Sequence, residues 1–187
     1  MPKGTQNTLR IIGGEWRGRK LQFPKVDAIR PTPDRVRETL FNWLEPMIHD
    51  ANCLDLFAGS GALGFEALSR GAASVIMCDS NPKIISTLKQ HADLLKTDKG
   101  QFVQTDALEL LNRNQQKFDL IFLDPPFNSD LLERCFRIME GRNCLNENAM
   151  IYVEASSKDE LPRPPVNWKL HRNKAAGDVA YYLYINE

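Results

Sequence analysis

Asp55-Leu-Phe-Ala-Gly59-Ser-Gly61-Ala-Leu-Gly64 is the stretch of sequence that decides the fold. It overlaps a short apolar run that begins at Cys53, and it leads into a helical pattern that continues to Ser69. Its three glycines have the spacing G-x-G-x-x-G. Glycines at the end of a strand permit a tight turn and let a ligand approach backbone N–H groups. The stretch therefore predicts a strand, a ligand-binding turn and a helix in succession.

Strands and helices alternate after this turn. Further apolar runs predict strands at residues 75–78, 102–105, 120–123 and 150–153, and helical patterns fill the gaps, among them 82–96 and 129–141. Such alternation indicates a mostly parallel sheet with helices on both faces. The tail differs, because strand patterns at 168–173 and 179–185 flank a turn at 176–178 with no helical pattern between them. We therefore expect an α/β fold whose parallel sheet ends in an antiparallel hairpin.

Two acidic residues indicate which cofactor the turn binds. Asp79 lies 20 positions after Gly59, at the end of the next strand, where its carboxylate can accept hydrogen bonds from both hydroxyls of a ribose. That spacing fits a nicotinamide dinucleotide as well as S-adenosylmethionine (SAM). Asp55 would repel a pyrophosphate on this loop, whereas it would attract the sulfonium and ammonium groups of SAM. The charge pattern favours SAM, and a glycine turn that merely packs a helix is the remaining alternative.

Asp106 follows the third predicted strand. In a SAM site it would lie beside the adenine and accept its amino group; it is also a good helix N-cap, and the two roles are compatible. The loop and the ends of the next two strands give the expected cofactor-binding residues, which are Asp55, Phe57, Ala58, Gly59, Ser60, Gly61, Gly64, Asp79, Ser80, Asp106 and Ala107.

A second motif, Asp124-Pro-Pro-Phe127, follows the apolar run that ends at Leu123. Two prolines fix the backbone and lack N–H donors, so the carbonyls here are expected to face outward as acceptors. Asp124 adds another acceptor, and Phe127 offers a flat ring for stacking. These groups suit an exocyclic amine on an aromatic ring, and the expected catalytic residues are Asp124, Pro125, Pro126 and Phe127. A plain Asp-Pro turn is the alternative.

The N-terminal segment is basic, although the 187-residue chain has a net charge of zero. Residues 1–37 hold nine Lys or Arg against three acids, a net charge of +6, so the remainder carries −6. Apolar residues at 9–12 and 16–23 predict a short hairpin around a tight turn or bulge at Gly13-Gly14. Thr32-Pro33-Asp34 predicts a helix start with Thr32 as the N-cap, and the helix should run to about Ile48. The arm suggests a polyanionic partner, with a solvated surface as the alternative.

Composition is that of an ordinary globular domain, with 42% apolar and 26% charged residues. No apolar run approaches the roughly 18 residues that cross a bilayer, and the first residues are polar, so we expect a cytoplasmic protein with no membrane partner. The four cysteines form no C-x-x-C pair, and Cys53 and Cys78 are interpreted as small buried thiols. No cluster has the spacing of metal ligands, so we expect no metal.

Four segments together resemble the bacterial small-subunit rRNA guanine-N2 methyltransferases, the RsmD-like family. They span residues 10–21, 30–42, 54–64 and 124–127, of which the first two are the discriminating ones, and the resemblance covers nearly the whole chain. It implies a Class I, Rossmann-like fold, SAM as methyl donor, and the 2-amino group of a guanine in 16S rRNA as acceptor, within the small ribosomal subunit or its assembly intermediate. The family often has glutamate where this chain has Asp79.

The resemblance also assigns roles to residues. Cofactor or catalytic positions of the family pattern are matched by Asp55, Gly59, Gly61, Asp79, Asp106 and Asp124. The basic arm would face RNA, since guanidinium groups pair with phosphates and stack on unpaired bases. The expected RNA contacts, several of them alternating along the second strand of the hairpin, are Arg10, Arg17, Arg19, Lys20, Arg30 and Arg35. Arg37 lies nearby, and Arg30 and Thr32 could instead close over the cofactor. We expect residues 1–48 to form an RNA-facing extension, 49–187 the methyltransferase core, and the protein to be a monomer.

Three other functions compete with this one. A DNA amino methyltransferase uses similar chemistry, but about 50 residues before the core leave no room for a domain that reads a duplex and flips a base. An RNA-binding or ribosome-assembly factor on an inactive methyltransferase fold would have no reason to keep Asp55, Asp79 and Asp124. An NAD oxidoreductase leaves both Asp124–Phe127 and the basic arm unexplained.

Overall fold

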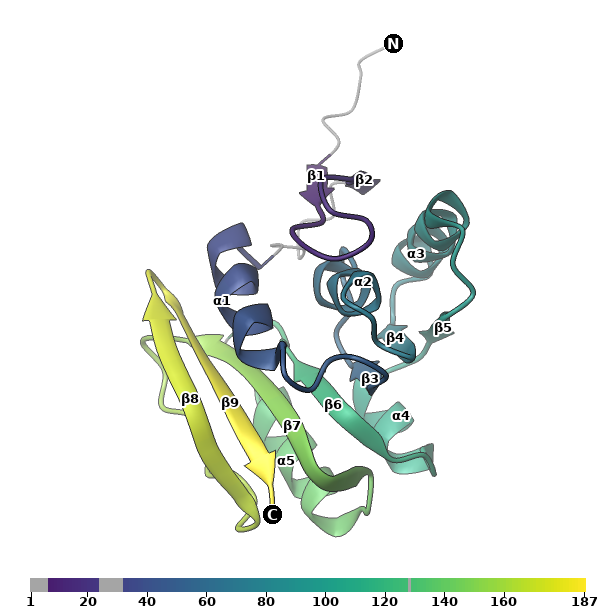
Figure 1. Cartoon of the computed structure of the whole chain (residues 1–187). Helices are drawn as coiled ribbons and strands as arrows, with labels where there is room; N and C mark the ends of the chain where they lie inside the picture. The colour runs from purple at the N-terminus through teal and green to yellow at the C-terminus, as the bar shows by residue number, and fades with distance from the viewer. Residues whose placement is uncertain (1–6, 24–31, 128) are drawn as a thin grey trace.

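The computed structural model describes residues 7–23, 32–127 and 129–187 of the chain (Figure 1). Seven strands form its main sheet, in the order β5-β4-β3-β6-β7-β9-β8. The bounds are β3 (Asn52–Asp55), β4 (Ser74–Asp79), β5 (Gly100–Gln104), β6 (Phe118–Leu123), β7 (Leu145–Ser156), β8 (Trp168–Ala176) and β9 (Val179–Asn186). The first five strands in this order, β5, β4, β3, β6 and β7, run parallel to one another. Strands β9 and β8 add an antiparallel hairpin at one edge. The expected fold is therefore confirmed.

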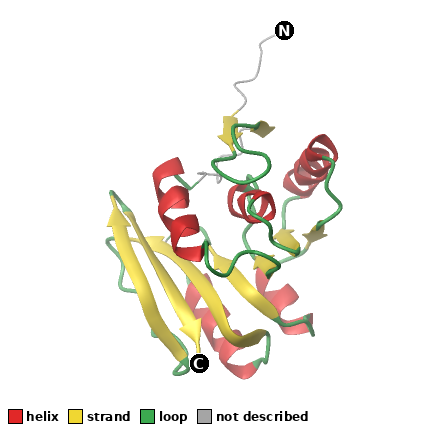
Figure 2. Ribbon diagram, in the orientation of Figure 1, coloured by secondary structure: helices red, strands yellow, loops and turns green. Residues whose placement is uncertain are grey.

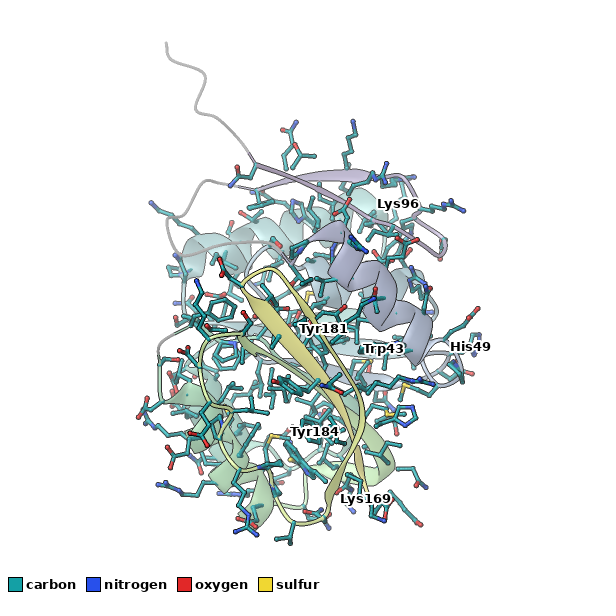
Figure 3. All side chains as sticks on the ribbon, turned by 90° about the vertical axis from the view of Figure 1, so that its left-hand side faces the viewer. Trp43, His49, Lys96, Lys169, Tyr181 and Tyr184 are labelled. Carbon is teal, nitrogen blue, oxygen red and sulfur yellow. The ribbon has the colours of Figure 1, made fainter. Side chains whose placement is uncertain are left out.

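Helices cover both faces of the sheet (Figure 2). They are α1 (Asp34–Leu44), α2 (Ala62–Ser69), α3 (Pro82–Leu95), α4 (Ala107–Arg113) and α5 (Leu131–Gly141). Alternation along β6 separates two hydrophobic clusters, because successive side chains of a strand point to opposite faces. Phe122 lies in the cluster of α1, α2 and α3, whereas Ile121 lies in the cluster of α4 and α5. Trp43 of α1 packs on Tyr181 of β9, with ring centroids 5.5 Å apart (Figure 3).

The order of the strands reverses between β3 and β6, which pair in parallel at the centre of the sheet. The chain leaves β3 through α2 toward β4 on one side, while β6 leads through α5 to β7 on the other. Open α/β sheets bind ligands outside the carboxyl ends of the strands at such a switch point. Both predicted motifs lie there, because one follows β3 and the other follows β6.

The N-terminal segment forms the expected hairpin, but the predicted tight turn at Gly13-Gly14 is wrong. Strands β1 (Asn7–Arg10) and β2 (Lys20–Phe23) pair antiparallel around a loop of residues 11–19. A Cβ atom on Gly14, whose φ is +74°, would lie 1.8 Å from the backbone oxygen of Ser69. The two glycines therefore serve the close approach of this loop to α2. Because the loop extends to Arg19, the basic residues do not alternate along one strand as expected.

Thr32 does not cap α1, and the helix ends earlier than expected. The cap position is taken by Pro33, and no side chain caps the helix, because the Thr32 hydroxyl donates to Asp124 instead. The helix ends at Leu44, after which a tighter turn brings the N–H of Met47 to the Leu44 carbonyl at 3.0 Å. Buried Val36, Leu40 and Leu44 form the apolar face.

An ion pair holds the 11–19 loop on α2. Glu66 of α2 is fully buried and accepts hydrogen bonds from the backbone N–H groups of Ile12 and Gly13 at 2.9 and 2.8 Å. Arg37 lies 3.6 Å from Glu66, and its guanidinium also donates to the Arg10 carbonyl at 3.0 Å. Only 1% of Arg37 is exposed, so this arginine is a structural residue and not the nucleic-acid contact that its position suggested.

Residues of the arm and of the sheet share one hydrophobic cluster, to which Leu9, Trp16 and Leu21 belong. The four cysteines are buried and free, which confirms the interpretation of Cys53 and Cys78. Among the described residues, no helix has the length and apolar character required to cross a membrane.

Candidate active site

The glycine loop is braced by the carboxylates on either side of it. Asp55 ends β3 and accepts a hydrogen bond from the N–H of Gly64, in the first turn of α2, at 3.2 Å. Gly61 has a φ of +80°, and a Cβ there would lie 2.6 Å from the ring of Phe65, so only glycine fits this bend. The loop between β3 and α2 is thus a tight turn that places backbone next to the carboxyl ends of β3 and β4.

Asp79 ends β4 and orders the backbone around it. One oxygen accepts from the N–H of Gly59 at 3.1 Å, and the other accepts from the N–H of Asn81 at 2.9 Å. The residue is partly exposed, and each carboxylate oxygen has a further lone pair. Both oxygens are therefore fixed in place, and each retains a lone pair that a ribose hydroxyl could use.

Asp106 is the N-cap of α4, as the alternative interpretation expected. Its Oδ1 atom accepts from the N–H groups of Leu108 and Glu109 at 2.9 and 3.2 Å. The residue is exposed, and both bonds use the same oxygen, so Oδ2 can accept from a ligand. The N–H of Thr105 donates to the Asp79 carbonyl at 3.3 Å, which places Asp106 near Asp79.

Burial makes Asp55 responsive to a cationic ligand. The side chain is 1% exposed, and this burial, with a smaller contribution from Asp79, raises its pKa to about 7, against hydrogen bonds from Gly64 and Phe57 that lower it. A sulfonium or ammonium group nearby would favour the ionised form. The carboxylate that braces the loop is therefore also a favourable neighbour for SAM.

Asp124 lies on the same face of the sheet as Asp55. In the register of β3 and β6, Asp55 pairs with Phe122, and Asp124 follows two residues later. Burial raises the pKa of Asp124 well above its usual range, the negative charges of Glu154 and Asp55 raise it further, and the hydrogen bond from Thr32 lowers it. The Thr32 hydroxyl donates to Asp124 Oδ2 at 3.3 Å. Asp124 thus lies at the switch point, close enough to Asp55 for the charge of one carboxylate to affect the other.

The rest of the reaction motif differs in detail from expectation. Pro125 is buried, whereas Phe127 is 38% exposed and presents its ring at the surface. The carbonyl of Pro126 does not simply face outward, because it accepts a hydrogen bond from the Ser129 hydroxyl at 2.8 Å. Its second lone pair and the Asp124 carboxylate are acceptors that an amine donor could use at this position.

Five of the six cations predicted to contact RNA are described by the structure, and all five are exposed. Exposed basic side chains are presented by Arg10, Arg17, Arg19, Lys20 and Arg35. The last of these is in the first turn of α1, three positions after Thr32, and the others belong to the hairpin docked on α2. Arg30 lies outside the described residues, so its expected role is not tested.

Sequence reasoning missed Glu154 and Tyr152, which stand on β7 beside Asp124. Glu154 is 4% exposed, and the Tyr152 hydroxyl donates to it at 2.8 Å. The signal in the sequence was a single acid in the otherwise apolar run of residues 149–155, in the second half of β7. A groove of about 500 Å³ lies elsewhere, between α5 and residues 160–165, and none of the predicted site residues line it.

The fold and this set of acidic side chains define a Class I methyltransferase that uses SAM, so the nicotinamide alternative is wrong. The family model described as Conserved hypothetical protein 95 matches residues 9–185. The chain belongs to this family of RsmD-like proteins.

The chain is similar to named relatives and to a solved structure over nearly its full length. "Ribosomal RNA small subunit methyltransferase D" of Escherichia coli K12 is 48% identical over 179 residues, which is 96% of this chain and 90% of the relative. The protein with the same name in Haemophilus influenzae is 46% identical over 182 residues, covering 95% of this chain and 94% of the relative. The solved structure of the yhhF protein of Escherichia coli superimposes with a TM-score of 0.91 at 46% identity, covering 97% of this chain and 99% of the other.

Proposed function

We propose that this protein transfers a methyl group from SAM to the exocyclic 2-amino group of a guanine in 16S rRNA, within the small ribosomal subunit or its assembly intermediate. The observation that carries the proposal is the position of Asp124, which faces the glycine loop across the switch point with the ring of Phe127 exposed beside it. The names of the relatives in Escherichia coli and Haemophilus influenzae support rRNA as the substrate.

The chemistry follows from the acceptors in the reaction motif. An exocyclic amine is a poor nucleophile, because its lone pair is delocalised into the ring. Acceptors on both N–H bonds, here Asp124 and a backbone carbonyl of the motif, favour a pyramidal nitrogen with a localised lone pair. SAM supplies an electrophilic methyl group on sulfur. Orientation of the amine and electrostatic complementarity to the shifting charge provide the rate enhancement, and no covalent intermediate with the protein is needed.

The basic arm is proposed to bring the RNA to this site. Arg17, Arg19 and Lys20 are exposed on a hairpin that Glu66 fastens to α2, the helix that begins at the cofactor loop. Phosphate contacts position a nucleic acid, whereas contacts to the base select the target. In this proposal residues 1–48 are the RNA-facing extension, residues 49–187 are the catalytic core, and the protein acts as a monomer.

The experiment is a comparison of substrates and products. The purified protein, with methyl-labelled SAM, is offered small ribosomal subunits, free 16S rRNA and duplex DNA, and the nucleosides are then analysed by mass spectrometry. The proposal expects N2-methylguanosine from the ribosomal particle. A methylated adenine or cytosine, or a preference for DNA, would contradict it. Failure to bind SAM in a calorimeter would favour a binding factor on an inactive fold.

A further inference from the structure

Glu154 is a buried acid with no basic partner among the described residues. It lies near the end of β7, and its hydrogen-bonding neighbours are the hydroxyls of Tyr152 and Thr32. An ionised carboxylate that is buried without a cation is costly, and proteins normally relieve that cost by neutralising the group. The position of Glu154 next to the reaction motif therefore requires an explanation beyond packing.

One hydroxyl lies between two carboxyl groups. The Thr32 hydroxyl donates to Asp124 Oδ2 at 3.3 Å, and it is also within hydrogen-bonding reach of Glu154. A hydroxyl has one proton to donate and two lone pairs, so it can serve only one carboxylate as donor at a time. The arrangement is satisfied when one of the two carboxyl groups is protonated and donates back to the Thr32 oxygen.

Where the structure describes the chain, the titratable side chains that face this pair are acidic or neutral. Asp55 faces it from β3, Tyr152 from β7 and Tyr181 from β9, where Tyr181 pairs with Glu154 in the strand register. Tyr181 is labelled in Figure 3. Arg37 of α1 donates to the Thr32 carbonyl at 3.2 Å, but its ion pairs are with Asp34 and Glu66.

This environment raises the pKa of both carboxyl groups. Burial raises the pKa of Glu154, against the hydrogen bonds from Tyr152 and Thr32, and burial and the charge of Glu154 raise that of Asp124. Like charges this close do not both ionise near neutral pH, and the protons come off the pair in two separate steps.

We propose that Asp124 and Glu154 form one carboxyl pair, bridged by the Thr32 hydroxyl, which holds a single proton and accepts the proton that the base amine loses on methylation. This inference rests on the proposed function. It gives Glu154 and Thr32 the role of positioning residues, because Asp124 is the member that faces the substrate.

The step balances in atoms and charge. The amine nitrogen forms a bond to the methyl carbon, and the carbon–sulfur bond breaks with its electron pair remaining on sulfur. The nitrogen then carries a positive charge and passes one proton to the pair, whose net charge goes from −1 to zero. The pair returns that proton to water after the product leaves, so no further reactant is needed.

The direct test is a titration that does not depend on activity. Carboxyl carbons of the full chain are labelled with ¹³C, and the Asp124 signal is identified by its loss in Asp124→Asn. The negative charge of Glu154 raises the pKa of Asp124. In Glu154→Gln that charge is gone, so the titration midpoint of Asp124 should fall by about 1 pH unit or more. A midpoint that is the same in both proteins overturns the pair, whatever the activity shows.

A second variant provides the kinetic test even if Glu154 variants do not fold. Thr32→Val removes the hydrogen bond that lowers the pKa of Asp124, so the acid limb of the single-turnover rate should move to higher pH. Thr39→Val is the matched control, because the Thr39 hydroxyl donates to the Arg35 carbonyl of the same helix, at 3.0 Å. An unmoved limb in Thr32→Val overturns the inference. A coupled titration in a protein that methylates no RNA contradicts the proposed function instead.

Discussion

The backbone N–H of Gly13 donates to the Glu66 carboxylate at 2.8 Å, across 53 positions of sequence. The same carboxylate accepts from Ile12 and from the Arg70 side chain, and it lies 3.6 Å from the buried Arg37. One acid of α2 thus holds the basic hairpin in a fixed place relative to the cofactor loop, where that helix begins. The position of the basic hairpin relative to the glycine loop is therefore a property of the folded structure.

Glu66→Ala should destabilise the protein strongly. It leaves the Arg37 charge buried beside two unpaired N–H donors, and breaking one half of a buried pair costs about 3–5 kcal/mol. The midpoint of urea unfolding measures the loss. Glu109→Ala is the control, since the Glu109–Arg113 pair is exposed and worth about 0.5 kcal/mol or less. A loss below about 1 kcal/mol in Glu66→Ala would show that the hairpin is held by its apolar contacts alone.

SAM binding should be coupled to the ionisation of Asp55. The folded pKa is raised to about 7 from 3.8, so the protonated form predominates below pH 7 and the ionised form, which suits a cation, predominates above it. Affinity for SAM should therefore fall as the pH drops through 7, by up to about tenfold per pH unit, with release of a proton on binding. Calorimetry in two buffers of different ionisation enthalpy measures that proton.

Two variants check this assignment of the proton. Asp55→Asn should bind SAM more weakly at high pH, without the pH dependence and without the proton release. Asp93→Asn, an exposed acid on α3, should behave like the unmodified protein. Persistence of the proton release in Asp55→Asn would assign the coupling to another group.

The carboxyl ends of the strands could be predicted from the sequence, because local patterns mark them. An apolar run followed by glycines or prolines identifies the end of a strand, and parallel strands bring such ends to one edge of a sheet. Asp55, Asp79 and Asp124 were found in this way. Asp106 could also be predicted as an N-cap, since capping depends only on the next three residues.

Contacts between distant segments could not be predicted in this way. Thr32 has the local features of an N-cap, but a carboxylate 92 positions away takes its hydroxyl. Arg37 and Glu66 look like surface charges in a helical pattern, but both are buried where the hairpin docks. Glu154 belongs to the site because the sheet places β7 next to β6, which no spacing in the sequence reveals.

Substitutions of Asp124 and Asp79 should affect different steps, catalysis for Asp124 and cofactor binding for Asp79. Asp124→Ala removes the acceptor for the amine, so turnover should fall by about 10²-fold or more while most of the affinity for SAM remains. Asp79→Ala removes the acceptor for the ribose hydroxyls, so it should weaken SAM binding instead. Single-turnover rates and calorimetric affinities for both variants make the comparison. Equal losses of rate and affinity in Asp124→Ala would contradict the role assigned to it.

The salt dependence of RNA binding should show whether the basic hairpin contacts RNA phosphates. Binding to each phosphate releases counterions, so the slope of log K against log salt falls by about 0.7 for each phosphate of single-stranded RNA that a variant no longer binds, and by slightly more on a duplex. Replacing Arg17 and Arg19 with alanine should weaken binding to the ribosomal particle and reduce the slope by about 1.4. Filter binding at several salt concentrations measures both. Replacement of Arg134 and Arg137, exposed cations of α5 on the other face of the sheet, is the matched control and should leave the slope unchanged. If the two double variants have the same slope, the hairpin lies outside the RNA interface.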